Sequence, residues 1–120
     1  MLKKLKAYLK DLRDRYVVNQ AQVTLPEFAP DRAVRYAVTF SGRVQHVGFR
    51  LELSELGKRL GLTGFCENLP EGDVYAEIQG PENRIRFLLD FMESLIRIHI
   101  TGKTMILLPT VRDESGFAIR

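Results

Sequence analysis

Two kinds of hydrophobic period follow one another along residues 34–108, and their order restricts the fold more than any other feature of the sequence. Apolar and polar residues alternate from Val34 to Phe40, which is the pattern of a half-buried strand with Arg35 on its polar face. The spacing changes to three and four residues between Phe49 and Leu60, which predicts an amphipathic helix. The remaining predicted elements are strands at 63–69, 74–79 and 96–108, and a helix at 81–95.

This order of elements, β-α-β-β-α-β, is that of the ferredoxin-like or split βαβ arrangement. It predicts an α+β fold in which two helices cover one face of an antiparallel sheet. Gly61 follows the first predicted helix directly and is expected to cap its C-terminal end. Gly57 lies inside that helix, where glycine is unfavourable, and so indicates close packing against a neighbour. Residues 117–120 are expected to form a short final strand.

The first 33 residues are expected to form an extension to a domain at 34–120. Apolar residues spaced by three and four over residues 2–16 predict an amphipathic helix. Pro26 and Pro30 mark residues 17–33 as a linker or a surface-hugging segment. Because so short a helix is marginally stable alone, its apolar face should dock on the domain, on a second copy of the chain or on a membrane surface. Docking on protein, including self-association, is favoured.

Composition restricts the partners and the compartment. Residues 1–16 hold six basic and two acidic residues, whereas the rest of the chain holds twelve basic and thirteen acidic ones. The body therefore lacks the broad basic surface of a nucleic-acid-binding domain. No run approaches the roughly 20 apolar residues of a transmembrane helix. The start lacks the apolar core of a secretory signal, and a single cysteine fits a reducing compartment. We expect a cytoplasmic protein that binds no nucleic acid.

The lone cysteine and the histidine of the last long strand have structural interpretations. Cys66 alternates with its neighbours in a strand and is expected to be a small core residue. His99 is expected on the exposed face of its strand, without a paired ligand, so no metal site is predicted.

The turn between the first strand and the first helix is the candidate site for chemistry. Unpaired N–H groups and the helix dipole make the start of a helix attractive to anions. Gly42 and Gly48 let the backbone approach a ligand closely, and Arg50 can donate two N–H bonds to phosphate oxygens. Spacing alone leaves open that this is a structural turn with an incidental arginine.

The run Gly42-Arg43-Val44-Gln45-His46-Val47-Gly48-Phe49-Arg50 resembles the acylphosphatase signature G-x-V-Q-G-V-x-F-R. Similar residues at 60–68, 72–82 and 117–120 extend the resemblance over about residues 34–120. It implies a hydrolase that converts small acyl phosphates to a carboxylate and inorganic phosphate, with no metal or cofactor. Arg50 would bind the phosphate, and Asn68 would orient the attacking water. The implied phosphate-binding loop consists of Val44, Gln45, His46, Val47, Gly48 and Phe49.

Two positions depart from the family pattern and leave a second hypothesis open. His46 stands at the central glycine of the loop, where it either holds a left-handed conformation at some cost or is a tolerated solvent-facing residue. Leu69 follows Asn68 where the family often has a hydroxyl residue. The alternative function is a non-catalytic anion-binding or regulatory domain. An RNA-binding module of the same topology would need stacking aromatics, for which Tyr36 and Tyr75 are isolated candidates.

Overall fold

The computed structural model describes residues 4, 23–95 and 98–120. Apart from Lys4, the expected N-terminal helix at 2–16 lies outside the described residues, and so does the start of the strand predicted from residue 96. The division into an extension at 1–33 and a domain at 34–120, like self-association through residues 1–16, stays a prediction. No helix in the described ranges is long and apolar enough to cross a membrane.

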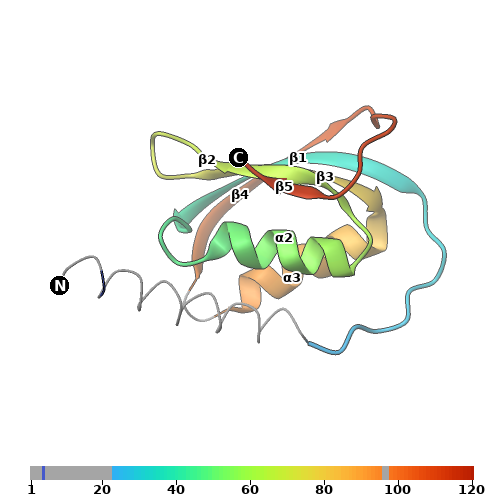
Figure 1. Ribbon diagram of the computed structural model, residues 1–120, viewed down its shortest axis with the longest axis horizontal. Helices are drawn as coiled ribbons and strands as arrows, with labels where there is room; N and C mark the ends of the chain where they lie inside the picture. Colours follow the sequence, from blue (N-terminus) through green and yellow to red (C-terminus); the bar gives the residue numbers. More distant parts are fainter. Residues whose placement is uncertain (1–3, 5–22, 96–97) are drawn as a thin grey trace.

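The described chain forms a five-stranded sheet with both helices on the same face (Figure 1). The elements are β1 (Ala33–Arg43), α2 (Phe49–Arg59), β2 (Thr63–Asn68), β3 (Val74–Pro81), α3 (Glu82–Ser94), β4 (His99–Leu108) and β5 (Phe117–Ile119). The spatial order of the strands is β4-β1-β3-β2-β5. This arrangement confirms the predicted ferredoxin-like α+β fold.

The sheet is mixed, whereas the sequence predicted an antiparallel one. Four strands pair antiparallel, with β1 between β3 and β4 and with β2 beside β3. The last strand, β5, instead pairs parallel to β2. Because β4 and β5 lie at opposite edges, the chain between them crosses the width of the sheet before β5 begins.

The core fills the space between the sheet and the two helices. Val38, Phe40 and Ile78 project into it from the sheet and meet Leu53 and Leu88 from the helices. Cys66 is fully buried there, as predicted. The ends of α2 follow the sequence expectations closely, because Gly61 adopts a left-handed φ of 73° directly after the C-cap residue Leu60.

The close packing inferred at Gly57 is also present. A Cβ atom at Gly57 would lie 3.0 Å from the ring of Phe117, so the missing side chain lets β5 pack against α2. This contact brings the last strand to the helix that begins at the candidate site.

The structure adds to or differs from the sequence expectations at three places. Arg35 lies on the polar face of β1 but is only 3% exposed, because Glu77, Gln79 and Glu114 surround its guanidinium. Pro81 ends β3, so α3 begins one residue later than expected. The strand expected to begin at Ile96 begins at His99 in the described chain, where the His99 side chain is exposed as expected.

The described part of the proline-containing segment, residues 23–32, lies along the helices. The Phe28 ring packs edge-on against Phe87 of α3, with ring centroids 5.6 Å apart. The side chain of Asp31 accepts a hydrogen bond of 2.8 Å from the backbone N–H of Asn83, near the start of the same helix. The segment therefore hugs the surface of the helical layer.

Candidate active site

The phosphate-binding loop at 44–49 begins where β1 leaves the sheet. The pairing of β1 with β4 shifts register between Ser41 and Gly42, and Gly42 has a φ of 114°. A Cβ atom at Gly42 would overlap the carbonyl oxygen of His99 in β4. Glycine is therefore required at this point for the chain to turn away from the sheet.

Two residues of the loop hold left-handed backbone conformations. His46 has a φ of 62°, and Gly48, the N-cap residue of α2, has a φ of 76°. The position where His46 replaces the family's glycine thus has positive φ, while its side chain is exposed. Val44 and Phe49, each 1% exposed, anchor the two ends of the loop in the core.

The side chain of Gln45 ties the loop to the turn between β2 and β3. Its Nε2 donates hydrogen bonds to the carbonyl oxygens of Leu69, at 2.9 Å, and Asp73, at 2.8 Å. The backbone N–H of Leu69 also donates to the Asp73 carbonyl at 2.8 Å. Sequence reasoning considered only the main-chain donor of Gln45, because nothing local indicates which distant carbonyls its amide reaches.

Arg50 lies in the first turn of α2, where backbone N–H groups have no intrahelical partner. Its Nη1 donates a hydrogen bond of 3.1 Å to the main-chain oxygen of Arg120, just beyond β5. Its own carbonyl oxygen lies 3.7 Å from the Sγ donor of Cys66 in β2. The start of α2 is thus connected to both β5 and β2.

The Cys66 thiol is not a nucleophile at this site. Burial raises the pKa of Cys66 to about 12, although the nearby charge of Arg50 acts in the opposite direction. The thiol therefore stays protonated at neutral pH, and its reactive thiolate form is scarce.

Asn68 is the last residue of β2. On one side of it in the chain a residue contacts α2, and on the other side a residue contacts the phosphate-binding loop. Cys66, two residues earlier, contacts Arg50, and Leu69, the next residue, accepts the bond from Gln45. Because side chains alternate along a strand, Asn68 points to the same face of the sheet as the buried Cys66, toward the helices. Its Oδ1 is buried and finds no hydrogen-bond donor among the described residues.

The structure therefore brings the predicted residues into one region at the start of α2. An arginine, helix-start amides and a carboxamide with an unused acceptor can hold an oxyanion and a water molecule beside it. Within the described residues, no group of three or more His, Cys, Asp and Glu side chains could hold a metal ion.

Comparison with known proteins decides the family. The acylphosphatase family model matches residues 36–119, which is more than half of the chain. The chain belongs to the acylphosphatase family. The family match covers every predicted site residue, from the phosphate-binding loop to Asn68.

Individual members of the family are similar over nearly their whole length. An acylphosphatase of Clostridium beijerinckii is 34% identical over 88 residues, which are 72% of this chain and 98% of that protein. The solved acylphosphatase from Coxiella burnetii is 29% identical with a TM-score of 0.66, covering 73% of this chain and 93% of that one. The acylphosphatase from Bacillus subtilis, 24% identical with a TM-score of 0.68, supports the fold, covering 72% of this chain and 98% of that one.

Proposed function

We propose that this protein hydrolyses small acyl phosphates to a carboxylate and inorganic phosphate, using Arg50, the phosphate-binding loop and Asn68. Membership of the acylphosphatase family supports the reaction. The residue roles rest on one observation about the neighbours of Asn68 in the chain. Cys66, two residues before Asn68, contacts Arg50, and Leu69, directly after it, accepts a hydrogen bond from Gln45. These contacts hold the proposed water-orienting amide next to the proposed phosphate-binding groups.

The chemistry suits such a site. The oxygen of the attacking water forms the new bond to phosphorus as the bond to the acyl oxygen breaks, and that oxygen leaves as a carboxylate. The released proton passes to a phosphate oxygen or to solvent, so no strong base is required. Catalysis then depends on positioning and on stabilising charge on the phosphoryl oxygens. A guanidinium and a set of amides supply that charge, and Asn68 accepts a hydrogen bond from the water.

Phosphate and the acyl phosphate are the ligands of this site, and we infer a cytoplasmic enzyme that binds no nucleic acid. The two aromatic residues that the sequence offers as candidates for stacking RNA bases lie on opposite faces. The hydroxyl of Tyr36 is 3.4 Å from Glu82 of α3, whereas that of Tyr75 donates to Glu77 on the other face. Two residues on opposite faces cannot form one stacking platform.

Hydrolysis of benzoyl phosphate by the full chain tests the proposal. We expect Arg50→Ala to lower kcat/KM at least about 10³-fold, because the guanidinium stabilises charge on the transferred phosphoryl group. Asn68→Ala should lower kcat more than it raises KM, because the amide acts on water rather than on the phosphate. Arg43→Ala is the matched control, since Arg43 is an exposed cation at the end of β1, and its kcat/KM should change less than about threefold.

The same experiment separates the enzyme from a non-catalytic anion-binding domain. Phosphate binding that depends on Arg50, without hydrolysis that depends on Arg50, would establish the non-catalytic alternative. Equal losses in the Arg43 and Arg50 variants would refute the specific role of Arg50.

A further inference from the structure

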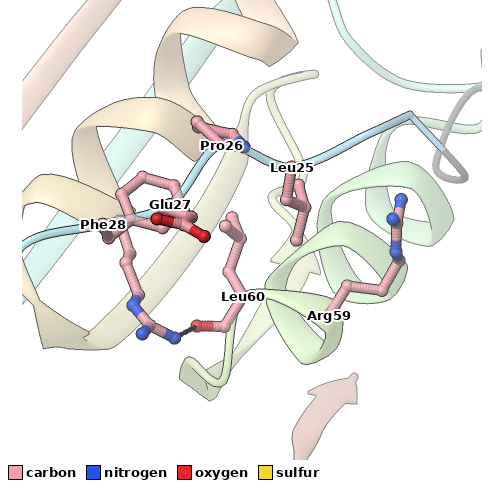
Figure 2. A pocket seen from close by; sticks show the side chains of 7 residues that line it. Leu25, Pro26, Glu27, Phe28, Arg59 and Leu60 are labelled. Atoms are coloured by element: carbon pink, nitrogen blue, oxygen red, sulfur yellow. Dashed lines mark hydrogen bonds between the residues drawn. The ribbon is translucent and has the colours of Figure 1, made fainter.

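A cavity lies at the far end of α2 from the candidate active site. It has a volume of about 380 Å³ and forms where the segment 23–28 crosses the end of α2 and the start of α3 (Figure 2). Cavities of this size are typical of small-molecule sites. Arg50 and Arg59 are nine positions apart in α2, which corresponds to about 14 Å along the helix axis. One small ligand therefore cannot occupy both places.

The cavity has an apolar body. Leu60, 1% exposed, forms part of its wall, and Leu25 and Phe28 line it from the crossing segment. Figure 2 shows Leu25 and Phe28 on either side of Leu60. These three side chains would cover the hydrocarbon or aromatic part of a ligand.

Two arginines line the cavity, and each donates a hydrogen bond to a backbone carbonyl. Arg84 Nη1 donates to the oxygen of Leu60 at 2.9 Å, and Arg59 Nη2 donates to the oxygen of Val23 at 2.6 Å. The Arg84 guanidinium carbon also lies 5.4 Å from the centre of the Phe28 ring. These contacts restrict the rotamers of both arginines before any ligand binds, which lowers the entropy cost of binding.

Arg84 has binding capacity that the fold does not use. Its one hydrogen bond within the described chain leaves most of the five donors of the guanidinium available, and none of the described carboxylates pairs with it. The described carboxylate in the cavity lining is that of the exposed Glu27.

We propose that this cavity binds a small monocarboxylate with an apolar body, whose carboxylate is held by Arg84. The apolar part lies on Phe28, Leu25 and Leu60. A guanidinium fork matches a carboxylate in geometry, and an aromatic ring suits a flat or branched apolar group. Glu27 repels the bound anion and limits its affinity.

Binding of benzoate to the full chain tests the proposal. Amide chemical shifts are followed by NMR in saturating inorganic phosphate, which competes for the proposed catalytic site. We expect saturable shifts at Phe28, Leu60 and Arg84, and we expect them to persist in the Arg50→Ala variant. Arg84→Gln should weaken binding about tenfold or more, because a charge-assisted pair is lost. Arg84→Lys, which keeps the charge, should retain part of the affinity.

Two further variants make the test specific. Arg86→Gln is the matched control, because Arg86 belongs to the same helix but not to the cavity lining, and benzoate affinity should not change. Glu27→Gln should tighten benzoate binding about two- to fivefold by removing a like charge. Weaker benzoate binding in the Glu27→Gln variant would overturn the assignment of the cavity to an anion. Shifts confined to residues 44–50, or equal losses in the Arg84 and Arg86 variants, would overturn the site.

Discussion

His46 holds a backbone conformation that glycine adopts at little cost. Its φ of 62° places a residue with a Cβ atom in the left-handed region, at a cost of about 1–2 kcal/mol for most residues. Histidine is among the less rare residues there, which moderates the cost. Because the His46 side chain is exposed within the proposed phosphate-binding loop, it would also take space beside a bound phosphate.

We expect His46→Gly to raise kcat/KM for benzoyl phosphate about two- to tenfold, because the loop then adopts its geometry without strain and without crowding. Steady-state kinetics at pH 7.5 measures the change. His46→Ala separates the two causes, since it removes the imidazole but keeps the Cβ atom. A rate equal to or below that of the unaltered protein would show that His46 is compatible with full activity.

At the scale of elements, one side chain fixes the relation between the phosphate-binding loop and the end of β2. Gln45 reaches two carbonyls of the turn that follows Asn68. Those carbonyls also accept backbone bonds, because Gly72 N–H donates to Leu69 and Leu69 N–H donates to Asp73. The turn can therefore keep its own shape without Gln45, and the contact serves to hold the turn against the loop. We infer that Gln45 is a positioning residue for Asn68.

Gln45→Met should keep the length of the side chain and remove both donors. We expect kcat to fall about 10–100-fold, because small misplacements of catalytic groups are costly, while KM changes less than about threefold. Kinetics with benzoyl phosphate separates the two constants. Gln79→Met is the control, since Gln79 bonds to Val111 away from this turn and its loss should spare kcat. An unchanged kcat in the Gln45 variant would contradict the positioning role.

Local signals explain which elements the sequence predicts correctly. The strand and helix periods of Val34–Phe40 and Phe49–Leu60 depend on neighbours a few positions apart, and Gly61 ends α2 through its own φ. The pattern of the loop likewise predicted Arg50 at the start of α2. The parallel pairing of β5, the burial of Arg35 and the reach of Gln45 depend on contacts between residues 24 to 79 positions apart. No local period carries that information.

At the scale of the whole molecule, a buried ion pair holds the chain between β4 and β5 onto the open face of the sheet. Arg35 donates to both carboxylate oxygens of Glu114, at 2.8 and 3.1 Å, and to Glu77 at 3.0 Å. The Arg35 side chain is 4% exposed and that of Glu114 is 21% exposed. The chain that Glu114 anchors continues into β5 and then to Arg120, whose main-chain oxygen accepts a bond from Arg50.

This ion pair makes stability depend on pH in a defined direction. The hydrogen bonds from Arg35 lower the pKa of Glu114 from its ordinary value of 4.5 in the folded protein. A carboxyl group with a lowered folded pKa stabilises the fold above its unfolded pKa. That contribution is lost as pH falls from about 4.5 through the lower folded value.

Glu114→Gln should therefore lower the free energy of unfolding by about 1–3 kcal/mol at pH 7, since Glu77 still pairs with Arg35 and limits the loss. The difference should shrink below about pH 4, because the protonated Glu114 of the unaltered protein then resembles glutamine. Urea unfolding at several pH values measures it. Glu55→Gln is the control, because Glu55 forms a surface pair with Lys58 and its loss should cost less than about 0.5 kcal/mol. A difference that persists unchanged at pH 3 would show that shape or packing, rather than the charge of Glu114, holds the crossing segment.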